Sequence, residues 1–143
     1  MYISDAKRLT TEGARKIKNA AVKAAEKAGI PITVAVVDAG GHLLVLERMD
    51  GGKFHSVHSA TVKAVCAASN KRNTGSTGAV GQSLDVLHAL GLALAAGPER
   101  WTAMEGGIPI MAGNECIGGV GVAGGNWEFD EKVAKEAAEA IKE

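Results

Sequence analysis

GGIPIMAGNECIGGVGVAGG, residues 106–125, is the stretch that decides the fold of this chain. Eight of its twenty residues are glycine, yet Ile108–Met111 and Ile117–Val122 have the composition of two short strands separated by a turn at Ala112–Asn114. Glycine weakens a strand interior, so it usually marks a bulge, a tight turn or a group that approaches the backbone closely. The stretch therefore predicts a hairpin with a close neighbour, which is either a ligand or another part of the protein.

A second hairpin is predicted further towards the N-terminus. Ile32–Val37 is a nearly continuous β-branched run, Asp38–Gly41 has turn composition, and His42–Arg48 alternates as a second strand. Trp101–Met104 is a candidate for a further strand at the sheet edge. The two hairpins together indicate a mainly antiparallel sheet.

Helical patterns surround these hairpins. One helix is expected from a cap at Ser4 or Asp5 to about Ala28, and a last one over Asn126–Ile141. Two more are expected between the hairpins, over Phe54–Ala68 and, capped by Ser83, over Leu84–Ala96. The latter is apolar almost all round, which predicts deep burial or a subunit interface. Because helices and hairpins are segregated, we expect an α+β fold in a single domain, residues 1–143.

The composition excludes several classes of partner. Sixteen Lys and Arg residues balance sixteen Asp and Glu residues without a basic cluster, so no nucleic-acid partner is expected. The longest apolar run, Ala89–Gly97, is too short to cross a membrane, and Met1–Thr10 is charged instead of resembling a signal-peptide core. We therefore expect no membrane partner and a cytoplasmic location. Cys66 and Cys116 form no CxxC pair and are interpreted as packed thiols.

Three glycines at the end of the opening stretch fit a dinucleotide-binding pattern. Gly119, Gly121 and Gly124 form GxGxxG between a predicted strand and a predicted helix. A dinucleotide site also needs a further strand that ends in an acidic residue about 20 positions on, and here only one helix follows. The weaker hypothesis is that the start of the last helix, at Gly124, Gly125 and Asn126, binds an anion. The alternative is that Asn126 only caps that helix.

A cluster of ionisable residues forms the second candidate site. It consists of Glu47, Arg48, Asp50, His55 and His58. Two histidines three residues apart lie on one face of a helix, where they can bind a metal or a haem iron. A metal site without haem requires a third ligand, for which Glu47 or Asp50 is nearest in sequence. The alternative is a solvated helix start with Arg48 paired to Asp50.

Several motifs together resemble the GlcG/HbpS-like family, which includes the C-terminal domain of PduO-type proteins. The matching segments are VVDAGGHLL (36–44), Arg48–Gly51, Lys63-Ala64, Gly106–Ile110, GGVGVAGG (118–125) and Asp130-Glu131. The resemblance implies a profilin-like α+β domain with a central antiparallel sheet flanked by helices, assembled into homo-oligomers from dimers to octamers. It also implies haem or a corrinoid as ligand in some members, and a link to cobalamin-dependent diol or glycerol metabolism in others.

We therefore expect a small homo-oligomeric protein that binds haem or a corrinoid. The expected binding residues are Arg48, Asp50, His55, His58, Gly107, Pro109, Gly124, Gly125 and Asn126, with His55 or His58 as axial ligand and Glu47 as a weaker metal ligand. One alternative is an enzyme for a small carboxylate or aldehyde, in which Arg48 anchors the substrate and Glu47 or Asp50 is the base. Another is a structural subunit that binds a partner through Leu84–Leu94.

Overall fold

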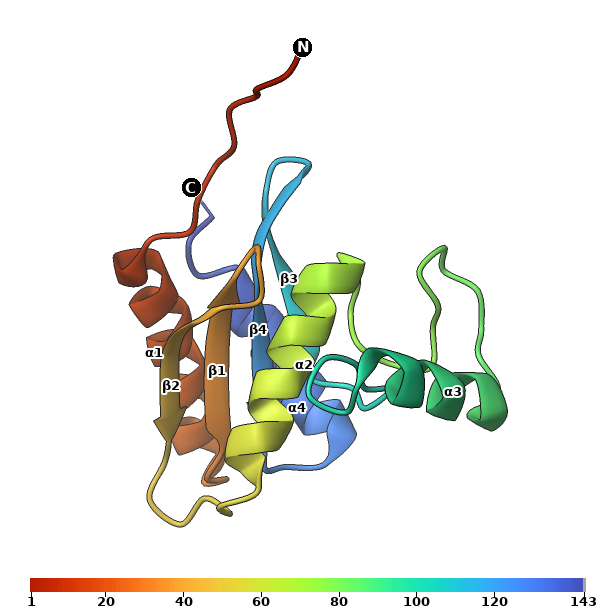
Figure 1. Cartoon of the computed structure of the whole chain (residues 1–143). Helices are drawn as coiled ribbons and strands as arrows, with labels where there is room; N and C mark the ends of the chain where they lie inside the picture. Colours follow the sequence, from red (N-terminus) through yellow and green to blue (C-terminus); the bar gives the residue numbers. More distant parts are fainter. Residues whose placement is uncertain (143) are drawn as a thin grey trace.

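The first strand of the N-terminal hairpin pairs with the second strand of the C-terminal hairpin, and together the two hairpins build the central sheet. The computed structural model describes residues 1–142 and contains a four-stranded antiparallel sheet of order β2-β1-β4-β3 (Figure 1). The strands are β1 (Thr33–Asp38), β2 (Leu43–Arg48), β3 (Gly107–Ala112) and β4 (Glu115–Ala123). Both predicted hairpins are confirmed. Trp101–Met104 is not a strand, so that prediction was wrong, although Trp101 is buried.

Helices cover both faces of the sheet. α1 (Thr11–Ala28) and α4 (Trp127–Ala138) share one hydrophobic core with β-branched residues of the strands, among them Val34, Val36 and Val122. α2 (Ser56–Asn70) packs on the opposite face, where alanines meet Ala35 and Val37 of β1. The arrangement is an α+β fold with a central antiparallel sheet flanked by helices.

The glycines of β4 explain how closely α2 lies on the sheet. A Cβ added at Gly119 would overlap the carbonyl oxygen of Ala64, and one at Gly121 would overlap that of Ala60. The backbone of α2 therefore rests directly on the backbone of β4. The close neighbour that the opening stretch predicts is, along these residues, a helix of the same chain.

The first helix begins later than the sequence pattern predicts. Its N-cap is Thr10, whose side chain accepts a hydrogen bond from the Gly13 backbone N–H, instead of Ser4 or Asp5. The hydroxyl of Thr10 satisfies one of the free N–H groups at the helix start. Residues 1–8 lie outside the helix and are exposed.

The apolar helix α3 (Val86–Ala96) departs most from expectation. It is capped by Asp85, not Ser83, and none of its residues is buried. Figure 1 shows it standing away from the sheet beyond α2. The expectation of deep burial within the chain was wrong, because the long segment after α2 carries α3 outwards. The interface alternative remains a prediction.

Candidate functional site

A pocket of about 270 Å³ lies between the first half of α2, the end of β4 and the start of α4. We call it the Lys63 pocket. Its lining residues are Lys53, His55, Ser56, Ser59, Val62, Lys63, Thr102, Met104, Ala123, Gly124, Gly125 and Asp130. Most of them are polar or small, so the pocket suits a small polar molecule.

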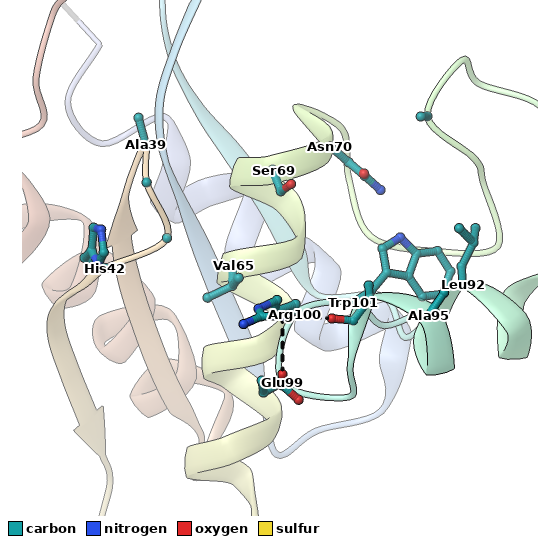
Figure 2. A pocket seen from close by; sticks show the side chains of 14 residues that line it. Ala39, His42, Val65, Ser69, Asn70, Leu92, Ala95, Glu99, Arg100 and Trp101 are labelled. Atoms are coloured by element: carbon teal, nitrogen blue, oxygen red, sulfur yellow. Dashed lines mark hydrogen bonds and ion pairs between the residues drawn. The ribbon is translucent and has the colours of Figure 1, made fainter.

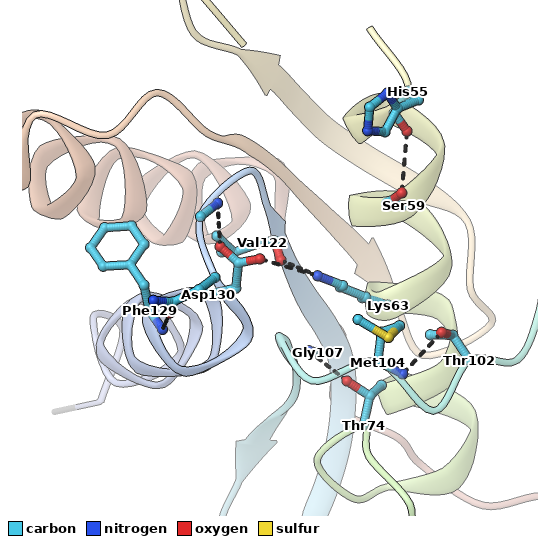
Figure 3. Close-up of polar contacts among 12 residues, drawn as sticks. His55, Ser59, Lys63, Thr74, Thr102, Met104, Gly107, Val122, Phe129 and Asp130 are labelled. Atoms are coloured by element: carbon cyan, nitrogen blue, oxygen red, sulfur yellow. Dashed lines mark hydrogen bonds and ion pairs between the residues drawn. The ribbon is translucent and has the colours of Figure 1, made fainter. Parts of the chain in front are cut away.

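A buried lysine and a buried aspartate form part of this pocket. Lys63 Nζ donates to the Val122 carbonyl oxygen at 2.9 Å and to Asp130 Oδ2 at 3.4 Å (Figure 3). Asp130 Oδ1 accepts a hydrogen bond of 2.8 Å from the Gly125 backbone N–H. The two side chains are only 7% and 4% exposed, respectively. α2 positions the amine and the first turn of α4 positions the carboxylate.

Burial shifts the acid–base properties of both partners. Desolvation lowers the pKa of Lys63, and the nearby carboxylates of Asp130 and Glu105 oppose this only in part. Desolvation likewise raises the pKa of Asp130, against the effects of Lys63 and the Gly125 amide. Both changes favour the uncharged forms. An amine and a carboxyl group that can each lose their charge are suited to proton transfer.

The two predicted histidines lie in adjacent hollows. His55 lines the Lys63 pocket. His58 lines a groove of about 560 Å³ between α2 and α3, which we call the α3 groove. Its other lining residues are Ser59, Val62, Ser76, Leu84, Val86, Ala89, Leu90, Ala93, Pro98, Trp101, Thr102 and Ala103. The groove is mainly apolar and shares Ser59, Val62 and Thr102 with the Lys63 pocket, so the two hollows have a common wall.

A larger hollow of about 870 Å³ lies between the turn after β1, the second half of α2 and the C-terminal half of α3 (Figure 2). His42, Trp101 and the weakly paired Glu99 and Arg100, 3.9 Å apart, are among its lining residues. Both charged side chains are well exposed. This hollow is therefore a gap that arises because α3 stands away from the rest of the chain. Its charged side chains are exposed, whereas those of the Lys63 pocket are buried.

The acidic residues near the histidines do not join them. Glu47 pairs with Lys18 of α1 at 2.9 Å, and Arg48 Nη1 donates to the Gly52 carbonyl at 2.7 Å instead of pairing with Asp50. Among residues 1–142, no three His, Cys, Asp or Glu side chains are grouped so that they can hold a metal ion. The predicted three-ligand metal site with Glu47 or Asp50 therefore does not form, because Glu47 sits on a strand that α1 covers.

The other predicted binding residues have structural contacts. The Asn126 side chain accepts from the Phe129 backbone N–H at 2.8 Å, which caps α4. Gly107 donates its N–H to Thr74 Oγ1 at 2.8 Å, and a Cβ there would overlap the Lys63 carbonyl oxygen. Pro109 lies half-buried in the edge strand β3. Of the nine predicted residues, His55, Gly124 and Gly125 line the Lys63 pocket, and His58 lines the adjoining α3 groove.

The sequence reasoning missed Lys63 and Asp130 as site residues. They are 67 positions apart, so spacing did not connect them. Two signals were present. Both residues lie in segments that match the family motifs, Lys63-Ala64 and Asp130-Glu131, and Lys63 lies on the same buried side of α2 as Ala60 and Ala64, where a lysine is unexpected.

The fold and the pocket define a class of small α+β protein in which helices on both faces of one antiparallel sheet meet around a polar pocket. Residues 9–139 match the family described as "Haem degrading protein HbpS-like", and the chain belongs to this family. The resemblance noted from the motifs is thereby confirmed. In the part of the chain that the structure describes, no helix is long and apolar enough to cross a membrane.

Two curated proteins illustrate the relationship. Protein GlcG of Escherichia coli (strain K12) is 32% identical over 115 residues, which cover 80% of this chain and 81% of GlcG. The corrinoid adenosyltransferase PduO of Salmonella typhimurium (strain LT2) is 31% identical over 126 residues. The match covers 88% of this chain but only 37% of PduO, so it concerns one part of that protein.

Solved structures have the same fold. A double mutant of HbpS from Streptomyces reticuli superposes with a TM-score of 0.81 at 33% identity, covering 99% of this chain and 92% of that one. A PduOC:heme complex superposes with a TM-score of 0.82 at 28% identity, covering 95% and 96%. The α+β fold predicted from the sequence is confirmed by these neighbours.

Proposed function

We propose that this protein binds haem and acts as an accessory protein. The observation that carries the proposal is the position of His58, an exposed imidazole in the wall of the mainly apolar α3 groove. Haem iron takes an imidazole nitrogen as axial ligand, and its macrocycle is flat and largely apolar. Support from outside the chain comes from the PduOC:heme complex, which has the same fold.

The residues around the groove fit such a ligand. Its volume of about 560 Å³ lies within the roughly 300–1,000 Å³ that is usual for small-molecule and cofactor sites. Leu84, Leu90 and Trp101 supply apolar surface for a macrocycle. Lys53 and His55, at the adjoining Lys63 pocket, are exposed and polar, and can face the carboxylate groups of the ligand. When bound, the haem would supply redox and ligand-binding chemistry that the side chains lack.

We further propose that the protein is a homo-oligomer with α3 in a subunit contact. Val86, Leu87 and Leu94 are 84%, 75% and 73% exposed, respectively, and form a large apolar surface on one short helix. Surfaces of this kind usually mark protein contacts. A second subunit over α3 would also close the groove and exclude water from the haem face. Oligomers from dimers to octamers all agree with this proposal.

A corrinoid is the second candidate ligand, and its support comes from the match to part of the corrinoid adenosyltransferase PduO. On this basis we propose a link to cobalamin-dependent diol or glycerol metabolism. A cytoplasmic location is part of the same proposal, and the free thiols of Cys66 and Cys116 agree with a reducing compartment.

Haemin titration of the purified protein tests the proposal. We expect a Soret band that shifts and saturates with the unaltered protein and with the control His42→Ala, an exposed histidine in the β1–β2 turn. His58→Ala should weaken binding by at least about tenfold, as loss of an axial ligand implies, and His55→Ala should do so less. Absence of a saturable Soret shift in the unaltered protein, or the same spectrum and affinity in His55→Ala/His58→Ala, would reject haem ligation by these residues. A parallel titration with cobalamin decides between the two ligands.

A further inference from the structure

The Lys63 pocket contains a chemical group for which haem binding in the α3 groove has no use. Lys63 sits between Ala60 and Ala64 on the buried side of α2, and its side chain is 7% exposed. Removing an ammonium group from water is costly, and an apolar residue of similar size often serves packing as well or better. A lysine that reaches a pocket from such a position therefore suggests chemistry at its amine.

Two contacts orient that amine and leave part of it available. Lys63 Nζ donates to the Val122 carbonyl oxygen and to Asp130 Oδ2. A lysine ammonium has three N–H donors, so one position remains for a molecule in the pocket that Lys63 lines. The groups facing the amine from other elements are Asp130 and Glu105. Figure 3 shows the Lys63 side chain extending from α2 towards Asp130 across the end of the sheet.

An unsatisfied hydroxyl lies close to the same pocket. Thr33 Oγ1 is the one buried side-chain oxygen or nitrogen in residues 1–142 that has no hydrogen-bond partner. Thr33 pairs with Ala123 across β1 and β4, so both side chains lie on the α2 face, and Ala123 lines the pocket. Buried polar groups without a partner are rare and point to a water or ligand atom that completes them.

We propose that the Lys63 pocket binds a small aldehyde or ketone, which Lys63 holds as a Schiff base with Asp130 as the acid. The volume of about 270 Å³ admits a carbonyl compound of a few carbon atoms. In the pocket wall, Ser59 Oγ donates to the His55 carbonyl and can still accept, and Thr102 Oγ1 accepts from the Met104 N–H and can still donate to an oxygen substituent of the ligand. Ser59 and Thr102 also line the α3 groove, but the reacting groups Lys63 and Asp130 do not, so the reaction at Lys63 does not require haem.

The reaction balances without a further reactant. The lone pair of the neutral Lys63 amine attacks the carbonyl carbon and forms the C–N bond, while the nitrogen gives one of its two protons to the carbonyl oxygen, which becomes a hydroxyl. Asp130 then protonates that hydroxyl, which leaves as water, and the nitrogen loses its remaining proton to the Asp130 carboxylate. The sum is amine plus carbonyl to imine plus water, with no change of oxidation state. Burial lowers the pKa of Lys63 and raises that of Asp130, which increases the fractions of neutral amine and of protonated acid.

Reductive trapping of the haem-free protein tests this assignment. The protein is incubated with propionaldehyde and sodium cyanoborohydride near neutral pH, and peptide mapping by mass spectrometry then locates the added propyl group. An exposed lysine has a pKa of about 10.4, and each unit below it gives about tenfold more neutral amine. We expect initial labelling of Lys63 at least about fivefold faster than that of exposed lysines such as Lys132.

Three variants complete the experiment. Lys63→Arg, which retains the charge, should lose the fast label, while Lys132→Arg on the exposed side of α4 should keep it. Asp130→Asn should slow trapping at Lys63 by several-fold, with circular dichroism used to check folding. Labelling of exposed lysines only, with Lys63 modified solely after unfolding, would overturn the proposal. The ion pair of Lys63 and Asp130 would then have only a structural role. Because haem is absent throughout, the outcome does not depend on the haem proposal.

Discussion

Lys63 and Asp130 connect two helices that pack on opposite faces of the sheet. The Lys63 ammonium on α2 lies 3.4 Å from the Asp130 carboxylate on α4, and both side chains are buried. Each side chain therefore neutralises a buried charge that would have no partner if the other side chain were absent. Loss of one partner strands an unpaired charge in a region of low dielectric constant, which is more damaging than loss of both.

The first prediction concerns the stability of this pair. Asp130→Ala should lower the free energy of unfolding by about 3–5 kcal/mol, since it leaves a buried ammonium without its carboxylate. The double variant Lys63→Met/Asp130→Ala should recover a large part of that loss. Urea unfolding followed by circular dichroism measures both. If the double variant is less stable than Asp130→Ala, the pair is not what makes the single substitution costly.

The second prediction concerns pH. Asp130 has a pKa raised above its usual value of 3.8, so the folded state binds its proton more tightly than the unfolded state. The stability from this group is complete below that value and is lost as the pH rises through the higher pKa of the folded state. Lys63, with a lowered pKa, acts oppositely: its contribution is complete above the usual value of 10.5 and is lost as the pH falls through the folded-state pKa.

Unfolding experiments at about pH 4 and about pH 6 can isolate the aspartate. As the pH rises from the lower to the higher of these values, the unaltered protein should become less stable relative to Asp130→Asn, because Asp130 ionises and the amide side chain of the variant does not titrate. An increase over this range would mean that attraction to Lys63 outweighs burial and lowers the pKa of Asp130.

The sequence was informative where a local pattern determines local structure. The β-branched run before Asp38 and the turn at Gly113 predict both hairpins, because turn chemistry and strand composition act over neighbouring residues. The cap of α4 at Asn126 follows from the same kind of local rule. Family membership was also accessible, since it rests on short motifs in a fixed order.

The rest depended on contacts between distant residues. Nothing in the spacing shows that α1 starts at Thr10, because Ser4 and Asp5 are equally good caps by composition. The apolar pattern of α3 predicts burial but does not show which part of the protein, or which partner, covers the helix. Within the described residues none of the side chains of α3 is buried. Lys63 and Asp130 meet only because α2 and α4 reach the same end of β4.

The third prediction tests the contact between α2 and β4. Gly121→Ala should destabilise the protein by about 1–3 kcal/mol or more, since the new Cβ overlaps the Ala60 carbonyl and neither backbone can move freely. Gly91→Ala is the matched control: it lies in α3 with open space around it, and alanine should leave stability unchanged or raise it by about 0.5–1 kcal/mol. Thermal unfolding compares the two. Equal melting temperatures for both variants would contradict the direct backbone contact.

The fourth prediction concerns the surface of α3 and the proposed assembly. Leu87 and Leu94 are 75% and 73% exposed in the single chain, so charge there should not disturb the core. If α3 is a subunit contact, Leu87→Glu/Leu94→Glu buries two carboxylates against a partner, and the molar mass from light scattering should fall to that of a smaller species while the circular dichroism spectrum stays unchanged. The control Trp127→Glu, at the exposed first turn of α4, should leave the molar mass as it was. If the molar mass of the α3 variant is unchanged, the subunit contact does not involve Leu87 and Leu94 and lies on another surface.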